Sequence, residues 1–186
     1  LVCGATNSQL QPTAAPDGRP LTIVVTGGRG QLGQALARRG AAHRMLCLGN
    51  AELDITRDSA VETIADLRPD LVINAAAFTD VDRCETEAAL AFAVNHEGAR
   101  HVALGAEAAG AGLVQVSTDY VFDGQKGEPY VEDDPPQPLC VYGASKLAGE
   151  IAARELCSRS FVARTAWLFG HGKDNFVRRV LARAKE

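Results

Sequence analysis

Leu21-Thr-Ile-Val-Val-Thr-Gly-Gly-Arg-Gly-Gln-Leu-Gly33 runs from a β-branched segment through a glycine-rich turn into a helical pattern. The apolar run at 21–25 is typical of a strand buried on both faces. Gly27, Gly30 and Gly33 then follow with GxxGxxG spacing. In such turns the first glycine permits a tight turn, the second lets a diphosphate approach the backbone, and the third allows close helix packing. Because a helix N-terminus also attracts anions, the stretch predicts a dinucleotide-binding turn, with an unliganded glycine turn as the alternative.

Strands and helices are expected to alternate along the rest of the chain. Apolar runs at 44–48, 71–74, 113–117 and 161–168 predict further strands. Helical patterns at 31–39, 58–67, 88–109 and 141–157 lie between them, and residues 119–138 read as a loop. Such alternation implies right-handed crossovers and a parallel sheet. We therefore predict an α/β fold: a Rossmann-like, doubly wound parallel sheet with helices on both faces.

The two ends of the chain differ in character. Residues 1–20 are rich in Pro, Gln, Thr, Ala and Gly and lack periodicity, which predicts a flexible leader. They also lack the basic and long apolar regions of a signal peptide. Residues 176–186 predict an amphipathic helix that stops without a cap or a loop. We therefore expect a Rossmann domain at 21–186 that is a fragment of a longer chain.

The composition narrows the class of protein. Of the 186 residues, 46% are hydrophobic and 23% charged, as in ordinary globular domains. The net charge of −4 argues against a broad nucleic-acid-binding surface, and no apolar run approaches the roughly 20 residues of a membrane helix. The five cysteines lack CxxC spacing and the four histidines lack metal-ligand spacing. These patterns predict free thiols in a reducing cytoplasm and no metal site.

The preference between NADPH and NADH depends on the end of the second strand. That strand ends Leu48-Gly49-Asn50, without the carboxylate that often holds the ribose 2′-hydroxyl of NAD. Arg29 lies in the glycine turn and could meet a 2′-phosphate. The pattern favours NADPH, with NADH as the alternative and with Arg29 as a plain solvated turn residue as the other interpretation.

A tyrosine and a lysine lie four residues apart in Tyr142-Gly-Ala-Ser-Lys146. In a helix this spacing places both side chains on one face. The reference pKa of tyrosine is about 10, and a nearby ammonium lowers it, so the pair can serve as a tunable proton donor. A chance pairing of two structural residues is the alternative. The glycine turn upstream and the hydroxyl-bearing strand end Ser117-Thr118 between them favour the catalytic interpretation.

Together these features resemble the extended short-chain dehydrogenases/reductases, and within them the dTDP-4-dehydrorhamnose reductase family. The resemblance runs from about Leu21 to the end of the chain. It implies reduction of a dTDP-4-keto-6-deoxy sugar with NADPH or NADH, in a cytoplasmic protein that can form a homodimer. Family members are longer, which implies that most of a small C-terminal substrate region is missing here. The strings that carry the resemblance are Gly30-Gln-Leu-Gly33, Leu53-Asp-Ile-Thr56, Asn74-Ala-Ala-Ala-Phe-Thr-Asp-Val-Asp82, Ser117-Thr-Asp-Tyr-Val-Phe-Asp-Gly124, Val141-Tyr-Gly-Ala-Ser-Lys-Leu-Ala-Gly-Glu150 and Arg164-Thr-Ala-Trp-Leu-Phe-Gly170.

The resemblance also implies roles for individual residues. Tyr142 would be the proton donor, Lys146 its electrostatic partner and ribose anchor, and Thr118 the hydroxyl that orients the ketone. Thr118, Asp119 and Trp167 match positions that border the sugar, with a core aromatic as the alternative for Trp167. The remaining positions expected along the cofactor are Gly27, Gly30, Gln31 and Leu32 at the diphosphate, Asp54 and Ile55 at the adenine, and Ala77, Phe78, Thr79 and Val116 beside it. For Asp54 the alternative is a turn or helix-capping carboxylate.

Two other functions remain open on the sequence. One is a regulatory subunit, because the methionine adenosyltransferase β-subunit resembles this family and carries similar YVFDG and YxxxK strings. The other is a reductase of a different 4-keto-6-deoxy nucleotide sugar, such as one carried by GDP. The residues quoted above do not separate these alternatives.

Overall fold

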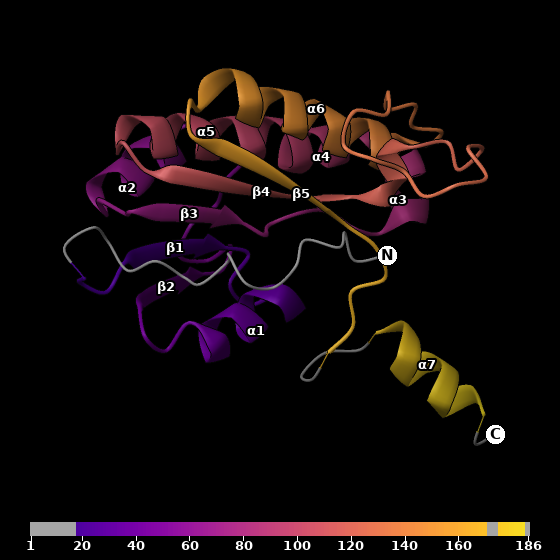
Figure 1. The fold of residues 1–186 in the computed structure, drawn as a ribbon, viewed down its shortest axis with the longest axis horizontal. Helices are drawn as coiled ribbons and strands as arrows, with labels where there is room; N and C mark the ends of the chain where they lie inside the picture. The colour runs from indigo at the N-terminus through magenta and orange to yellow at the C-terminus, as the bar shows by residue number, and fades with distance from the viewer. Residues whose placement is uncertain (1–17, 171–174, 185–186) are drawn as a thin grey trace.

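The computed structural model describes residues 18–170 and 175–184. Its centre is a five-stranded sheet in which every pairing is parallel and the strand order is β2-β1-β3-β4-β5. All strands therefore begin at one end of the sheet and finish at the other (Figure 1). The strands are β1 (Thr22–Thr26), β2 (Arg44–Leu48), β3 (Leu71–Asn74), β4 (Gly112–Thr118) and β5 (Ser160–Thr165).

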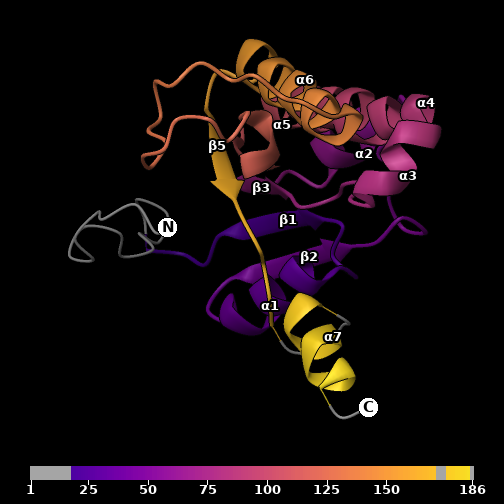
Figure 2. The ribbon, with the colours of Figure 1, turned by 90° about the vertical axis from the view of Figure 1, so that its right-hand side faces the viewer.

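Helices cover both faces of the sheet unequally. Figure 2 shows α1 (Gln31–Arg39) on one side, and α2 (Ser59–Asp66), α5 (Gly98–Ala108) and α6 (Val141–Leu156) together on the other. The chain reverses direction across the sheet between β2 and β3, since β2 and β3 flank β1. This topology confirms the predicted doubly wound α/β fold. In doubly wound folds, ligands bind beyond the carboxyl ends of the strands where the chain reverses in this way, which here is at β1 and β3.

The main hydrophobic core lies between the sheet and the layer of α2, α5 and α6. Strand residues alternate, so that one face of each strand supplies side chains to this layer. The strand members of the core are Val24, Val72 and Leu113, and the helix members include Ile64, Val102, Ala103, Ala106 and Ala153. Small residues on α5 allow close helix contact, since a Cβ on Gly105 would lie 2.8 Å from the Cβ of Ile64.

The helix predicted at 88–109 has an internal irregularity. It consists of α4 (Ala88–Phe92), a π-helical turn (Ala93–Glu97) and α5. Asn95, in the π turn, is 2% exposed and bonds Phe78 and Ser145, which explains why the turn widens there. The short helix α3 (Val81–Thr86) was not predicted, because its six residues are mostly polar and show no helical periodicity.

The chain ends also differ from expectation. The predicted leader is anchored at its end, because Arg19 pairs with Asp70 next to β3. Residues 1–17 of that leader lie outside the described residues. The terminal helix α7 (Phe176–Arg183) begins at the expected residue, with an N-cap in which the Asn175 side chain accepts from the Arg178 amide. Residues 185–186 of the predicted helix are not described.

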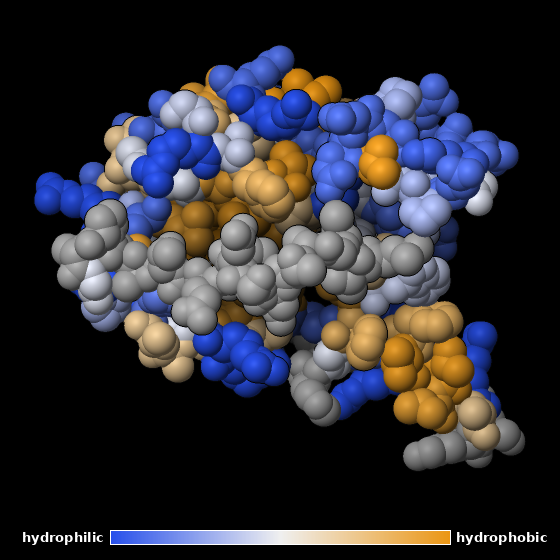
Figure 3. Space-filling view, viewed as in Figure 1, coloured by the Kyte–Doolittle hydropathy of each residue, from blue (hydrophilic) through white to orange (hydrophobic). Residues whose placement is uncertain are grey.

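Apolar side chains remain exposed near the end of the described chain. Figure 3 shows hydrophobic residues gathered over α7, where Phe176, Val177, Val180 and Leu181 are all exposed. Phe161 on β5 is also exposed. Within the described ranges, no helix has the length and hydropathy needed to cross a membrane.

Candidate active site at the carboxyl end of the sheet

The glycine turn leaves the N-terminus of α1 open to a ligand. Gly27 has φ +65°, and a Cβ there would lie 2.7 Å from the backbone of Ala76, so only glycine fits. A Cβ on Gly30 would meet nothing within 4 Å except the Gly27 carbonyl oxygen, at 3.0 Å. Gly30 is also the N-cap of α1, and no side chain caps that helix or adds a negative charge to its first turn. The first amides of α1, at Gln31 and Leu32, are thus available to a diphosphate.

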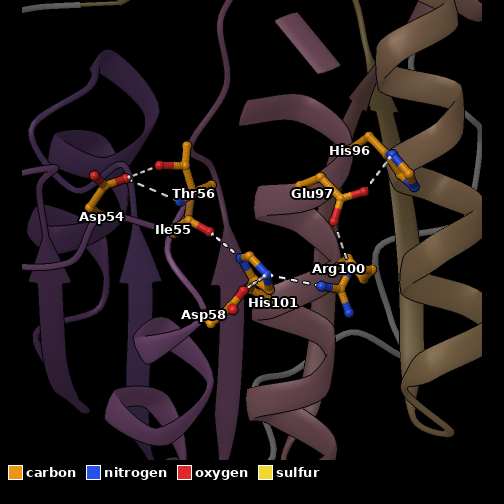
Figure 4. A network of polar contacts seen from close by, with 8 residues as sticks. All are labelled: Asp54, Ile55, Thr56, Asp58, His96, Glu97, Arg100 and His101. Carbon is orange, nitrogen blue, oxygen red and sulfur yellow. Dashed lines mark hydrogen bonds and ion pairs between the residues drawn. The ribbon is translucent and has the colours of Figure 1, made fainter. Parts of the chain in front are cut away.

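The segment after β2 is held by a network of polar contacts (Figure 4). The Asp54 carboxylate accepts from the Thr56 amide and hydroxyl, at 3.1 and 2.7 Å, and these bonds lower its pKa. Asp54 therefore forms the turn that sequence analysis gave as its alternative role. The Ile55 side chain is buried in the core, and its carbonyl oxygen lies 2.8 Å from Nδ1 of His101 on α5.

The residues after β3 are clamped by Asn95. Its side chain accepts from the Phe78 amide at 2.8 Å and donates to the Phe78 carbonyl at 3.0 Å. The same amide group donates to the Ser145 hydroxyl on α6, also at 3.0 Å. Asn95 therefore fixes the 77–79 segment, with Ala77 and Thr79 on either side, against the helix that carries Tyr142. Asn95 was not expected from the sequence, and its only sequence signal is an amide side chain in the middle of a predicted helix.

Tyr142 and Lys146 lie on one buried face of α6, against the end of β4. Tyr142 is 9% exposed, and its ring packs with Phe78 and Cys84. Lys146 is 3% exposed, and its Nζ donates to the Val116 carbonyl at 2.7 Å. Thr118, at the end of β4, is also buried. The predicted catalytic residues are thus brought together where β4 ends.

The two titratable groups of this cluster have shifted pKa values. Burial raises the pKa of the Tyr142 phenol above its ordinary value, and a hydrogen bond with the Thr118 side chain opposes that shift. Burial lowers the pKa of Lys146 to about 8, while the Glu150 carboxylate opposes. The expected lowering of the tyrosine pKa by Lys146 is not seen, because the ammonium is directed to the Val116 carbonyl and desolvation dominates at the phenol. A phenol that keeps its proton is the form a proton donor requires.

The two further positions expected to border the sugar, Asp119 and Trp167, are both exposed. Asp119 is exposed and accepts from the Thr118 hydroxyl at 3.0 Å. Trp167 follows β5, is 71% exposed and stacks edge-on with Phe176 at a centroid distance of 4.8 Å. Its backbone has φ +53°, an uncommon conformation for a bulky residue. Among the described residues, Trp167 is thus not packed into the core.

Comparison with known proteins identifies the family. Residues 21–186 match the family described as "RmlD substrate binding domain". The chain belongs to this family. A dTDP-4-dehydrorhamnose reductase from Streptomyces griseus is 49% identical over 173 residues, which cover 90% of this chain and 56% of that protein. The reductase of the same name from Mycobacterium tuberculosis H37Rv is 45% identical over 165 residues, or 84% and 54% of the two chains.

Solved structures of family members confirm the fold. A dTDP-4-dehydrorhamnose reductase from Bacillus anthracis, in complex with NADP, has a TM-score of 0.86 and 40% identity, and the match covers 89% of this chain and 60% of that one. The chain thus spans little more than half the length of the curated relatives it matches.

At this end of the sheet, Glu52 was absent from the sequence expectations, and Ser117 was expected only as part of the hydroxyl-bearing strand end. Glu52, four residues beyond the end of β2, forms an ion pair with Arg29. Ser117 carries a buried hydroxyl that lacks a hydrogen-bond partner among the described residues. Glu52 could have been found by searching past the strand end for a carboxylate. Ser117 has a sequence signal only in its place beside Thr118.

Proposed function

We propose that the protein containing this chain reduces dTDP-4-dehydro-6-deoxy-L-mannose to dTDP-L-rhamnose, as a dTDP-4-dehydrorhamnose reductase of nucleotide-sugar and cell-surface polysaccharide biosynthesis. The observation that carries the proposal is the cluster of Tyr142, Lys146 and Thr118 at the end of β4. Similarity to relatives supports the substrate, since those from Streptomyces griseus and Mycobacterium tuberculosis carry that reductase name.

The cofactor of the proposed reaction is NADPH, with NADH as the alternative. The open N-terminus of α1 and the close-packed glycine turn suit the diphosphate of a dinucleotide. The structure of the Bacillus anthracis relative contains NADP. When bound, the dihydronicotinamide supplies the hydride that reduces the C4 ketone.

The residues of the chain supply a proton and a stabilising field. Tyr142 donates its phenolic proton to the oxygen of the ketone as that oxygen gains charge. On substrate binding, the Thr118 hydroxyl would turn from Asp119 to donate to the same oxygen, which stabilises the developing negative charge. Lys146 places an ammonium one helical turn from Tyr142, where it can donate to the ribose hydroxyls of a bound cofactor. The Ser117 hydroxyl adds a second polar group at this strand end.

The finer properties follow the same proposal. The substrate is a dTDP-sugar bound at the Asp119 and Trp167 rim, and the protein works in the cytoplasm as a homodimer without nucleic acid. The described cysteines Cys47, Cys84, Cys140 and Cys157 are all free thiols, which suits a reducing compartment. A Streptomyces antibioticus relative, 43% identical, is named a probable dTDP-4,6-dihydroxy-2-methyloxan-3-one 4-ketoreductase, which favours another dTDP-4-keto sugar as the second candidate substrate.

Replacement of Tyr142 by phenylalanine tests the catalytic assignment. In the intact protein, Tyr142→Phe removes the proton donor and keeps the ring that packs with Phe78 and Cys84. We expect turnover of dTDP-4-dehydrorhamnose, measured as NADPH oxidation, to fall by about 10²–10⁴-fold, while NADPH binding by calorimetry stays unchanged. Tyr130→Phe is the matched control, because it removes a hydroxyl that bonds Asp123 instead.

The same assay separates the competing functions. If Tyr142→Phe turns over at the wild-type rate, the role of Tyr142 is wrong. If the wild-type protein oxidises NADPH with a different dTDP-4-keto sugar but not with dTDP-4-dehydrorhamnose, the second candidate substrate is the correct one. A third outcome is that none of the keto sugars causes the wild-type protein to oxidise NADPH, and that the protein copurifies with a synthetase. The protein is then a regulatory subunit rather than an enzyme.

A further inference from the structure

Helix α6 carries a third titratable residue on the face that holds Tyr142 and Lys146. Glu150 follows Lys146 by four residues, so the three side chains share one face of the helix on successive turns. Lys146 is 3% exposed and Glu150 only 1%. Because a glutamate is almost never fully buried unless it is paired, the burial of Glu150 beside Lys146 calls for a physical explanation.

Arg164 on β5 is the ion-pair partner of Glu150. Its Nε lies 3.0 Å from Oε1 and its Nη2 lies 2.7 Å from Oε2, so the guanidinium binds both carboxylate oxygens. The guanidinium carbon also lies 4.9 Å from the ring centroid of Phe122, which holds the cation from another side. In the sheet, Arg164 pairs with Ser117 of β4, the residue after Val116, whose carbonyl accepts from Lys146. The ion pair thus fixes the Glu150 carboxylate over the part of the sheet that Lys146 contacts.

A buried ammonium needs an opposing charge to keep its proton. Removal from water disfavours the charged form of a lysine, whereas a nearby carboxylate favours it. A carboxylate buried to the extent of Glu150 stays ionised only with a cationic partner, which Arg164 provides in bidentate geometry. The shifts agree with this arrangement: burial lowers the pKa of Lys146 to about 8, and the Glu150 carboxylate opposes that effect.

Other titratable groups packed around α6 face different atoms. After burial and the Thr118 side chain, the groups that affect the pKa of Tyr142 are Asp119, Cys84 and Tyr120. Glu85 of α3 accepts from the Val141 amide at the start of α6. Further residues line the outer surface of α6 or the cavity beside Arg164, namely His96, Arg100, Glu132, Asp133, Asp134, Arg154 and Glu155. The charge that acts on Lys146 is that of Glu150.

We propose that Glu150, held by Arg164, is a positioning residue that keeps the Lys146 ammonium charged and directed to the Val116 carbonyl. The inference rests on the proposed function, because Lys146 is the residue assigned there to the cofactor ribose. Glu150 acts through Lys146, and Arg164 acts through Glu150. The charged row on α6 therefore sets the pH range in which the proposed reaction proceeds.

The pH at which Lys146 loses its proton tests the inference in the intact protein. NMR follows the chemical shift of the ¹³C-labelled lysine Cε, and Lys146→Arg identifies the signal by its absence. Glu150→Gln keeps the shape of the side chain and removes its charge, so the titration of Lys146 should move down by about one pH unit. The kcat/KM for reduction of dTDP-4-dehydrorhamnose should follow, so that the ratio of variant to wild type falls about tenfold between pH 6 and pH 9.

A second variant and a control separate the effect of charge from an effect on folding. Glu150→Gln leaves Arg164 without its carboxylate, which costs stability. The double variant Glu150→Gln/Arg164→Gln replaces both members of the pair with neutral side chains and should show the same downward shift. Glu155→Gln makes the matched change on an exposed residue of α6 and should leave the titration and the pH profile as in the wild type.

The outcomes distinguish the inference from the proposed function. If Lys146 titrates at the wild-type pH in the folded variants, the ion pair has a structural role only and the inference is wrong, whatever the change in stability. If the titration moves and the kcat/KM profile does not, the inference is also wrong, because the charge of Lys146 then has no part in the reaction. If the titration moves but the wild-type protein reduces no keto sugar, the proposed function fails and the effect of Glu150 on Lys146 stands.

Discussion

Lys146 carries an ammonium from which water is almost excluded, and this sets a pH limit on the proposed reaction. Its pKa is lowered to about 8 by burial, compared with 10.5 for an ordinary lysine. Because kcat/KM reports the ionisation of the free enzyme, we expect this parameter to fall above pH 8 by about tenfold per pH unit. The pH profile of NADPH oxidation by the intact protein measures this limb.

Stability should change in the opposite direction over the same pH range. The folded pKa of Lys146 is lower than the unfolded one, so the folded state loses its proton first and the unfolded state holds more protons between pH 8 and 10.5. The contribution of this group to stability therefore rises with pH in that window. Lys146→Arg retains a cation at these pH values and should move the alkaline limb of kcat/KM upwards. A wild-type profile that stays flat to pH 10 would show that the ammonium is not required.

Single residues also show where the sequence was sufficient for the site and where it was not. Tyr142 and Lys146 follow from a spacing rule, because a helix dictates which side chains share a face. Glu52 does not, because its contact with Arg29 depends on two glycines that let the turn and strand end approach each other. The direction of the Tyr142 pKa shift likewise depends on desolvation, which only packing determines.

His101 links two elements through a contact that is invisible in the sequence. Its Nδ1 must carry the proton that is donated to the Ile55 carbonyl at 2.8 Å, since a carbonyl only accepts. Its Nε2 lies 2.9 Å from Asp58 at the start of α2. The imidazole is almost wholly buried on α5. His101 thus fastens the segment after β2, which carries the expected adenine contacts, to the helix layer.

Replacement of His101 should destabilise the fold through that bond. His101→Leu leaves the Ile55 carbonyl without its buried partner, and we expect the free energy of unfolding to fall by about 1–3 kcal/mol. His101→Asn keeps an N–H donor near the position of Nδ1 and should cost less. Urea unfolding of the two variants and the wild type measures the difference. If the leucine and asparagine variants are equally stable, the hydrogen bond contributes nothing to the free energy of unfolding. Any loss relative to the wild type would then come from packing alone.

At the level of helices and strands, the sequence predicted most elements because their patterns are long or strongly apolar. All five strands were expected within a few residues of their observed bounds. The element α3 was missed because six mostly polar residues are too few to show periodicity, and its N-cap bond from Arg83 to Asp80 is a local feature. The π turn was missed because it arises from the tertiary contacts of Asn95 with Phe78 and Ser145.

On the scale of the whole molecule, an ion pair between two residues distant in sequence holds the segment before β1 against the sheet. Arg19 contacts Asp70 through two hydrogen bonds, and the Thr22 amide donates to the same carboxylate at 2.7 Å. These bonds lower the pKa of Asp70 to about 2, from an ordinary value of 3.8. The segment before β1 is thereby fastened to the start of β3.

The stabilising contribution of the Arg19–Asp70 ion pair should be lost at acid pH. Because the folded pKa of Asp70 is depressed, its stabilising contribution is complete above about pH 4 and is lost as pH falls through about 2. We expect Asp70→Asn to reduce stability at pH 6 by at most about 1 kcal/mol, since the partner Arg19 is half exposed. Urea unfolding between pH 6 and pH 2 should then show a smaller loss in Asp70→Asn than in the wild type. Asp66→Asn, an exposed carboxylate on α2, is the control, and an equal acid dependence in Asp70→Asn and wild type would contradict the assignment.

Because all the strands are parallel, the candidate active-site residues gather at the carboxyl edge of the sheet, and the opposite edge carries none of them. The groups assigned to chemistry lie where the strands finish, whereas the return from α5 into β4 passes through Gly110 at the opposite end. Gly110 has φ +65°, and a Cβ there would touch nothing within 4 Å. A fluorophore, affinity tag or tether spliced into that turn would point away from the nucleotide crevice. Gly110 is accordingly the position at which the protein could be labelled or fixed to a sensor surface while its crevice stays open to solution.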